Sequence, residues 1–336
     1  MKNLIINKDY SVLNKTYEIN LNAKESVDIN YLNNIAENIS IEKIKAINDY
    51  FKNISIALKT NTVSLFLTDK NKKDYLNYLK QEIHNIVKYD TSYFQNVFPV
   101  REALLSKIKK LDNLDIPFYK HDSATGRSKI VAGTNFLTMK KENRKNLTYK
   151  NNKIAEVDFN SCEPYFYLLS KNKINSIETD IYDKIKKDLS IKINDRKLLK
   201  QSILSILYGA GYETIKRISK IKKEDYDSLK DYFEIDSFEK KLIKEKNDLG
   251  YILNFYNRPV IVKSDRSILN YWVQSSVADF CYLSFNEFVK KNKDINFHAI
   301  IHDAILFSSK EKININYLIC PISKFKIPVS FSYFDE

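Results

Sequence analysis

One stretch of seventeen residues, with side chains repeating at every fourth position, constrains this chain more than any other feature. In residues 195–211, DRKLLKQSILSILYGAG, four side chains recur at intervals of four: Arg196, Lys200, Leu204 and Tyr208. Residues spaced by four share one face of an α-helix. Asp195 is a favourable N-cap, and Gly209 favours a stop after the last turn. The pattern predicts a helix that suits a ligand with phosphates and a flat base; a solvated cationic edge is the alternative.

The composition favours a globular protein with a polyanionic partner. The chain has 336 residues, of which 43% are hydrophobic and 13% aromatic, so extensive disorder is not expected. Five glycines and six prolines favour long helices with few tight turns. The net charge of +13 favours nucleic acid over a membrane as the partner. Because a Lys-rich composition also follows from an AT-rich genome, charge alone does not decide the function.

No feature of the sequence indicates secretion or membrane insertion. The three cysteines lie far apart and form no CxxC pair, which predicts neither a disulfide framework nor a zinc site. No apolar run reaches membrane-spanning length, and the first twenty residues lack a hydrophobic signal core. We expect a soluble protein in the cytoplasm of a bacterial cell or a phage-infected host, with no membrane partner.

The first third of the chain shows mainly helical periodicity. Apolar positions spaced by three or four predict four helices, at residues 28–39, 44–54, 71–86 and 101–111. A short strand is predicted between the second and the third of them, at residues 63–67. Residues 1–26 show no assignable pattern. The region contains no D-x-E motif, and at somewhat over one hundred residues it is too short for an exonuclease domain plus a DNA-gripping one. We interpret it as a helical region that holds a duplex or, alternatively, as a helical cap on the core.

An acidic residue follows a buried strand near the middle of the chain. Residues 154–169 read IAEVDFNSCEPYFYLL, and the apolar run predicts a strand that carries Asp158 at its end. A helix is predicted to begin near Pro164. An aspartate at such a strand end is often a turn-former or a cap, so the residue alone does not establish a catalytic role.

Two further patterns lie in the last quarter of the chain. Within residues 264–285, SDRSILNYWVQSSVADFCYLSF, three polar side chains again lie four apart: Arg266, Asn270 and Gln274. They are predicted to share a helix face, as exposed polar stripes also do. Residues 297–308, FHAIIHDAILFS, predict a hairpin with His302 and Asp303 at its turn.

Together these motifs resemble those of family A (Pol I-like) DNA polymerases. The resemblance spans five motifs in the family's order across residues 125–310, the first being the TGR triplet that ends at Arg127. It implies an α+β right-hand polymerase with an antiparallel-sheet palm, helical fingers and a helical, thumb-like N-terminal region. The implied thumb-like region is residues 1–115, and the implied fingers are residues 171–261. The palm comes in two parts, residues 116–170 and 262–336.

The resemblance also implies how the catalytic residues act. Asp158 and Asp303 would hold two Mg²⁺ ions, with Mn²⁺ as an alternative, and the backbone carbonyl of Phe159 would be a further metal ligand. Two carboxylates are enough, because Mg²⁺ is usually held by one or two carboxylates plus substrate phosphates. Arg196 and Lys200 would balance the triphosphate charge, and Lys200 would protonate the leaving pyrophosphate.

The remaining residues of the five motifs would contact the nucleotide and the duplex. Four are expected to bind the nucleotide: Glu163, which would lie under the sugar and exclude a 2′-hydroxyl, Leu204, Tyr208 and His302. Four are expected to bind nucleic acid in the minor groove of the primer–template: Arg127, Arg266, Asn270 and Gln274. Purines and pyrimidines both present an acceptor there, so amide donors test pair geometry without reading sequence.

The chain departs from the family pattern at three places. Leu204 stands where the family usually has an aromatic residue, so the nucleotide pocket is expected to be looser. Pro164 and Tyr165 replace the usual Leu-Arg pair, which puts the support of Glu163 in doubt. Ala304 replaces the glutamate that usually follows the second metal-binding aspartate, so the third carboxylate is missing.

The function implied is template-directed DNA synthesis without proofreading, with primer–template DNA and deoxynucleoside triphosphates as partners and replication accessory proteins as further ones. A single-subunit RNA polymerase or a primase-like enzyme is the nearest alternative, because Ser202 and Ser205 replace residues that DNA polymerases favour. The other alternative is a non-catalytic nucleic-acid-binding relative. Retention of both Asp158 and Asp303 counts against this second alternative.

Overall fold

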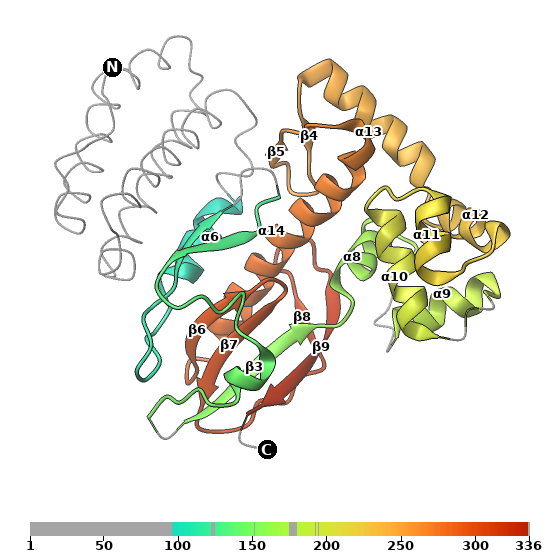
Figure 1. Cartoon of the computed structure of the whole chain (residues 1–336). Coiled ribbons are helices and arrows are strands. Elements are labelled where there is room, and N and C mark those ends of the chain that lie inside the picture. The colour runs from blue at the N-terminus through green and yellow to red at the C-terminus, as the bar shows by residue number, and fades with distance from the viewer. Residues whose placement is uncertain are drawn as a thin grey trace, which may run out of the picture.

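The computed structural model describes residues 96–121, 125–150, 152–174, 180–191, 193 and 195–334. The elements predicted before residue 96 lie outside this part of the chain, together with the unassigned residues 1–26. Within the described residues, no helix is both long enough and apolar enough to cross a membrane. Mixed α/β structure with an antiparallel sheet makes up this part of the chain (Figure 1).

A five-stranded antiparallel sheet forms the base of the molecule. Its strand order is β6-β7-β3-β9-β8, with bounds Asn296–Ile301, Ala304–Ser309, Lys153–Phe159, Lys326–Tyr333 and Tyr317–Ile319. The central strand β3 thus comes from the middle of the sequence, while its neighbours β7 and β9 come from the end. Side chains alternate between the two faces of a strand, and in β3 the buried Ala155 and Val157 alternate with Glu156 and Asp158.

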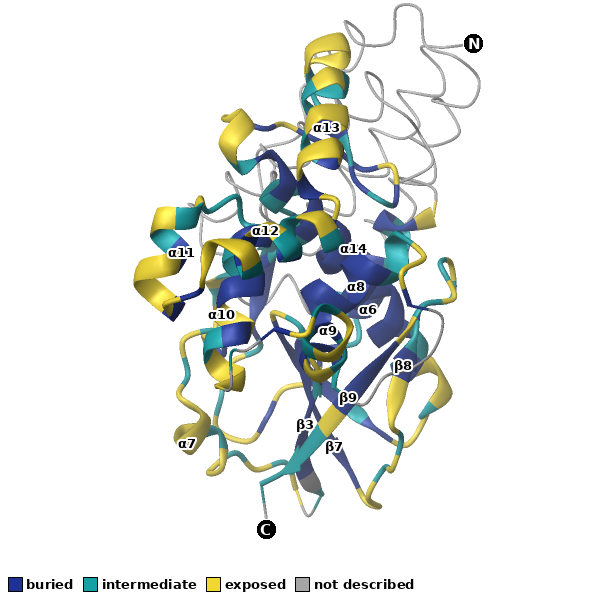
Figure 2. Cartoon of the chain, turned by 90° about the vertical axis from the view of Figure 1, so that its right-hand side faces the viewer, coloured by how far each residue is buried: buried dark blue, intermediate teal, exposed yellow. Residues whose placement is uncertain are grey.

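One long helix covers a face of this sheet. Helix α14, Ile268–Lys291, buries 17 of its 24 residues and is apolar around most of its circumference, as expected of a helix enclosed in the core (Figure 2). The ring of Phe159 lies 5.2 Å from that of Phe280 and 5.1 Å from that of Phe285, which joins the end of β3 to α14. Helix α6, Phe98–Leu105, packs against α14 as well. On the sheet's other face, Leu111 and Phe136 pack against β6 and β7.

Within the described residues, six helices lie between β3 and α14 in the sequence, and they occupy one side of the sheet and the region above it (Figure 1). Their bounds, from α8 to α13, are Cys162–Ser170, Ile181–Leu189, Arg196–Leu207, Tyr212–Ser219, Lys223–Tyr232 and Ile235–Leu249. The predicted cap of α10 is confirmed, because the Asp195 carboxylate accepts the backbone N–H groups of Lys197 and Leu198. The predicted stop is confirmed as well: Gly209 has φ +79°, and a Cβ there would lie 2.3 Å from the carbonyl oxygen of Arg266.

Three smaller elements complete the described fold. Strands β1, Phe118–His121, and β2, Ser128–Ala132, pair with each other, and β4, Ile252–Leu253, pairs with β5, Pro259–Val260. The sequence of residues 251–262 predicts a strand pair or a loop, and the β4–β5 pair confirms the first of these. The short helix α7, Lys141–Arg144, precedes β3. The three cysteines are free and buried.

The structure corrects three boundaries. The helix predicted at residues 101–111 is α6, Phe98–Leu105; Pro99 favours the earlier start, and Ile108 and Leu111 are buried without being helical. The charged composition of residues 219–247 predicts a solvated helical stretch, and the structure divides it into α12 and α13, because Glu234 takes a left-handed conformation between them. Arg266 is not in α14 but in the 3-10 turn Asp265–Ser267 that leads into it.

Candidate active site

The two predicted metal-binding aspartates meet at one end of the sheet. Asp158 is the penultimate residue of β3, and Asp303 follows His302 in the two-residue turn between β6 and β7. In the ladder Asp158 pairs with Ala304, and the Phe159 N–H donates to the carbonyl of Asp303 at 3.1 Å. The sheet therefore places the two carboxylates on adjacent chain segments, 145 residues apart in sequence (303 − 158).

Burial and mutual repulsion govern the charge of these carboxylates. The pKa of Asp158 is raised to about 7, first by burial and then by the negative charges of Asp303 and Glu156. Burial also raises the pKa of Asp303, against the effect of its own backbone N–H and of Arg127. Two like charges held close in a partly dry site favour protonation of one of them or the binding of a cation.

This donor set fits a magnesium site that is completed by substrate. No group of three or more His, Cys, Asp or Glu side chains within the described residues is arranged to hold a metal ion. Asp158 and Asp303 supply two hard oxygen donors, and their repulsion is what a divalent cation would relieve. Because Mg²⁺ keeps several waters and takes substrate phosphates as ligands, two carboxylates suit it. A calcium cage of six to eight protein oxygens is not what the chain offers.

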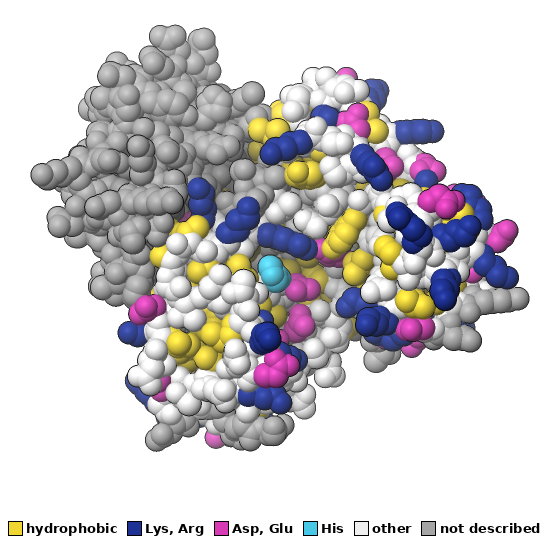
Figure 3. Space-filling view, viewed as in Figure 1, with side chains coloured by type: hydrophobic (Ala, Val, Ile, Leu, Met, Phe, Trp, Pro, Cys, Tyr) yellow, Lys and Arg dark blue, Asp and Glu magenta, His cyan; other side chains and the backbone are white. Residues whose placement is uncertain are grey.

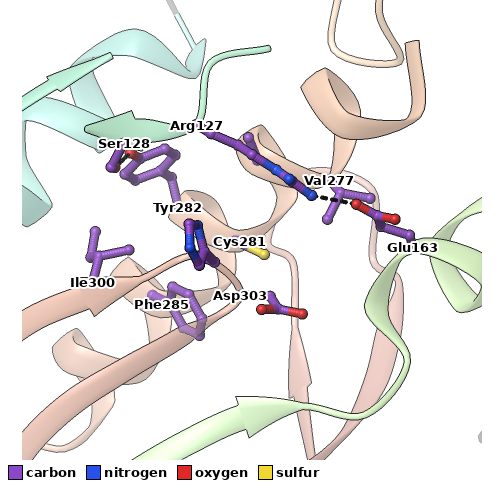
Figure 4. Close-up of a pocket in the computed structure, with 11 residues that line it drawn as sticks. Arg127, Ser128, Glu163, Val277, Cys281, Tyr282, Phe285, Ile300 and Asp303 are labelled. Atoms are coloured by element: carbon purple, nitrogen blue, oxygen red, sulfur yellow. Dashed lines mark hydrogen bonds and ion pairs between the residues drawn. The ribbon is translucent and has the colours of Figure 1, made fainter. Parts of the chain in front are cut away.

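Glu163 is the centre of a hydrogen-bonded cluster built from three of the predicted motifs. Arg127 forms an ion pair with its Oε1 (Figure 4). The Tyr208 hydroxyl donates to its Oε2. The Glu163 side chain is 9% exposed, and burial raises its pKa, while the contacts with Tyr208 and Arg127 oppose that shift. We refer to Arg127, Glu163 and Tyr208 as the Glu163 cluster. Tyr208 lies just past the last turn of α10, so this helix is tied to the start of α8.

The cationic residues of α10 have different surroundings. Lys200 is exposed, and its charge lowers the pKa of Asp158, Glu163 and Asp303, so it lies within electrostatic range of all three carboxylates. Arg196 is instead paired with Asp180, at 2.6 Å, and lies over the Tyr182 ring, 5.1 Å from its centroid. Asp180 also caps α9. Leu204 is half-buried on the same helix.

Three of the four predicted minor-groove residues lie in the 3-10 turn before α14 or in the first turns of that helix. Arg266 is exposed, whereas Asn270 and Gln274 are half-buried. The Oδ1 atom of Asn270 is buried and has no hydrogen-bond partner among the described residues. In the next two turns of α14, Ala278 and Cys281 line a pocket. The same pocket is lined by Arg127, Glu163, His302 and Asp303. Burial and the charge of Arg127 lower the pKa of His302, which favours a neutral imidazole.

Sequence reasoning missed two sets of charged residues around this site. The short helix α7 brings Arg144 to Glu156, at 2.5 Å, and places the charge of Lys141 where it lowers the pKa of Asp158. No local pattern identifies these residues. Arg258 and Asp279 form a buried ion pair behind Arg127. Asp279, in the middle of the apolar run of α14, could have indicated such a pair in the sequence, because a buried carboxylate requires a partner.

Charged side chains gather around one region of the surface (Figure 3). Acidic side chains lie beside a histidine near the centre of the view, and basic side chains surround them on the sheet side and on the helical side. Such an arrangement of cations around a small acidic centre suits a substrate that carries several phosphates.

No protein-family model matches the chain, and no curated protein matches its sequence. Among solved structures, the chain is similar to the POL domain of Pol1 from M. smegmatis, in complex with DNA primer-template and dNTP. The similarity has a TM-score of 0.47 and 12% sequence identity, and it covers 98% of this chain and 69% of that chain. Similarity at this level does not establish a family or a function for the chain.

Proposed function

We propose that this protein is a template-directed DNA polymerase that adds deoxynucleotides to the 3′ end of a primer. One observation carries the proposal: residues from four separate motifs surround one acidic centre. Asp158 and Asp303 form that centre, the charge of Lys200 acts on both carboxylates, and Arg127 and Glu163 line the same pocket as Asp303. Motifs of unrelated structural purpose would have no reason to converge on one site.

Each residue has a role that its position supports. Asp158 and Asp303 would hold the two Mg²⁺ ions, which when bound would activate the attacking oxygen and neutralise charge on the leaving pyrophosphate. Lys200 lies where it can balance the negative charge of a triphosphate and donate a proton to the pyrophosphate as it leaves. Arg196 binds the outer phosphates after it leaves Asp180.

The Glu163 cluster supports a preference for deoxynucleotides. Arg127 and Tyr208 bind both oxygens of the Glu163 carboxylate, so the side chain is held in one position. A fixed, buried carboxylate beneath the ribose leaves no space for a 2′-hydroxyl. The departure at Pro164 and Tyr165 does not remove this support, because the support comes from other motifs.

The alternative of an RNA polymerase or primase-like enzyme rests on Ser202 and Ser205, and the structure removes the support from Ser202. Ser202 is 0% exposed, and its hydroxyl donates to the Leu198 carbonyl at 2.9 Å within α10. A serine whose hydroxyl bonds back to its own helix does not select a substrate. Primer extension with deoxynucleotides and with ribonucleotides separates the two functions directly.

A primer-extension assay with matched aspartate variants tests the proposal. Asp158→Asn and Asp303→Asn should each lower synthesis by about 100- to 1,000-fold or more, the scale on which a lost transition-state charge contact acts. Asp294 is the control: it is exposed and precedes β6, at the opposite end of that strand from Asp303. Asp294→Asn should extend primers normally. Undiminished extension by either active-site variant would contradict the assignment.

A second measurement detects the metal without requiring activity. Mg²⁺ that binds only the folded protein raises its melting temperature. At pH 8, Mg²⁺ should therefore raise the Tm of the wild type and of Asp294→Asn, and it should leave the Tm of Asp158→Asn unchanged. An equal Mg²⁺ response in all three proteins would place the cation elsewhere.

A further inference from the structure

A buried ion pair lies behind the loop that carries Arg127. The Nε atom of Arg258 is 2.9 Å from Oδ2 of Asp279, and the two residues are 5% and 0% exposed. Asn254 donates from Nδ2 to the same oxygen at 2.6 Å, and its Oδ1 accepts the backbone N–H of Arg258 at 2.8 Å. The pair therefore joins the β4–β5 hairpin to the middle of α14.

The same guanidinium also holds the TGR loop. Nη2 of Arg258 donates to the carbonyl of Thr125 at 2.9 Å and to the carbonyl of Ser275 at 3.1 Å. Gly126 packs directly against the group: its φ is +68°, and a Cβ there would lie 2.3 Å from Nη2. Since Thr125 and Gly126 immediately precede Arg127, Arg258 holds the backbone from which the Arg127 side chain extends.

These contacts form one continuous path from the core to the site. Asp279 orients Arg258, Arg258 fixes residues 125–126, and Arg127 then reaches Glu163. A guanidinium has donors in fixed directions, so it joins a carboxylate and two carbonyls in one geometry only. Lysine, with a flexible stem and a point charge, does not reproduce that geometry.

We propose that Arg258, held by Asp279, is a positioning residue that sets the place of Arg127 and thereby the Glu163 cluster. Arg258 does not touch the nucleotide; it acts through Arg127. This inference rests on the proposed function in its last step, which is that the Glu163 cluster selects the sugar. Its first step, the fixing of the loop, is independent of any activity.

Three changes remove the contact in different ways. Arg258→Lys keeps a charge beside Asp279 but loses the directed bond to Thr125. The pair variant, Arg258→Met with Asp279→Leu, removes both charges and leaves no buried carboxylate unpaired, so folding is retained. Gly126→Ala places a methyl group where the guanidinium lies. Its control is Gly250→Ala, because Gly250 has φ +81° and nothing within 4 Å of the added Cβ.

Hydrogen exchange measures the loop without a substrate. In metal-free protein, Arg258→Lys and Gly126→Ala should lower the protection of backbone amides in residues 126–132 by at least about tenfold, because a local opening becomes easier. Gly250→Ala should leave that protection unchanged. Unchanged protection in both Arg258→Lys and Gly126→Ala would overturn the inference.

A double-mutant cycle tests whether Arg258 acts through Arg127. The pair variant and Arg127→Ala should each lower kcat/KM for deoxynucleotide addition at least about tenfold, the loss typical of one charge-assisted hydrogen bond. They should also lower the preference for deoxynucleotides over ribonucleotides. Combined, they should lose little more than either alone, because residues that act as one unit are not additive.

The possible outcomes separate the inference from the proposed function. Full additivity of the two losses would overturn the positioning role even if the enzyme is a polymerase. If the pair variant does not fold, Arg258→Lys replaces it in the same cycle. If the wild type extends no primer and Arg258→Lys still lowers the loop's protection, the polymerase function is refuted. The role of Arg258 in holding the loop is then retained.

Discussion

At the scale of single residues, burial in the candidate active site disfavours the charged form of its carboxylates. Asp158 ends a buried strand beside a second carboxylate, and its pKa is raised to about 7 as a result. A carboxyl that binds its proton more tightly when folded stabilises the fold fully below its unfolded pKa, which is near 3.8. That contribution is lost as the pH rises through about 7, so the metal-free site is unfavourable at physiological pH.

Asp158→Asn should therefore stabilise the metal-free protein above pH 7. Asparagine removes the buried charge, and the partly exposed position limits the gain to the order of 1 kcal/mol, or roughly 2–4 °C in Tm. Melting is measured in EDTA at pH 8 and at pH 5. At pH 5 the difference should shrink, because wild-type Asp158 is then protonated. A wild type that melts above the variant at pH 8 would show that the carboxylate is not repelled.

Glu163 should determine the choice of sugar. Glu163→Ala opens space beneath the ribose, and a steric clash of about 1–3 kcal/mol corresponds to a change of roughly 10- to 100-fold in the ratio of ribonucleotide to deoxynucleotide incorporation. Glu163→Gln is the matched control, because it keeps the size of the side chain and should keep the preference. A ratio that does not change in Glu163→Ala, or a wild type that uses both sugars equally, would favour the RNA polymerase or primase-like alternative.

At the scale of secondary structure, the sequence predicted elements well where the signal is local. The four-residue spacing, the Asp195 cap and the Gly209 stop all act within α10, and all were confirmed. The hairpin of β6 and β7 was likewise predictable from two apolar runs around a short polar turn. The start of α14 was misplaced because Arg266 follows the polar spacing of the helix but belongs to a 3-10 turn.

Contacts between elements could not be predicted in the same way. Nothing near Arg196 in the sequence indicates that its partner is Asp180, or that Arg258 meets Asp279, because each pairing depends on how helices and hairpins pack. The resemblance supplied roles for Glu163, Arg127 and Tyr208 separately. Their mutual contact was not predicted, although it explains how Glu163 is held without the family's usual neighbours.

Asp180→Asn should strengthen nucleotide binding. Asparagine caps a helix as well as aspartate does, so α9 keeps its start, while Arg196 loses its carboxylate partner. Exposed ion pairs contribute about 0.2–1 kcal/mol, so KM for deoxynucleotide should fall by up to about fivefold with kcat little changed. Asp183→Asn, in the first turn of the same helix, removes the same charge without releasing Arg196 and should not change KM. A KM that rises in Asp180→Asn would mean that Asp180 prepares Arg196 for the phosphates.

At the scale of the whole molecule, the net charge of +13 follows directly from the sequence and does not depend on any single contact. Lysine and arginine that replace counterions on a duplex make binding steeply dependent on salt, with a log–log slope of about −0.9 for each phosphate contact. The affinity for a primer–template duplex should therefore fall linearly on such a plot, with a slope that indicates several contacts. A flat response between low and physiological salt would count against a bound duplex.

The same plot can locate the duplex on the molecule. Arg266 is exposed in the 3-10 turn that leads into α14, the helix that carries Asn270 and Gln274. Lys310 is instead exposed just past β7, at the end of the sheet away from Asp303. Arg266→Ala should reduce the magnitude of the slope by about one, and Lys310→Ala should leave it unchanged. Both changes remove one positive charge, so any effect of net charge alone would be equal in the two variants. Equal slopes would then show that the charge attracts nucleic acid generally without a defined path along α14.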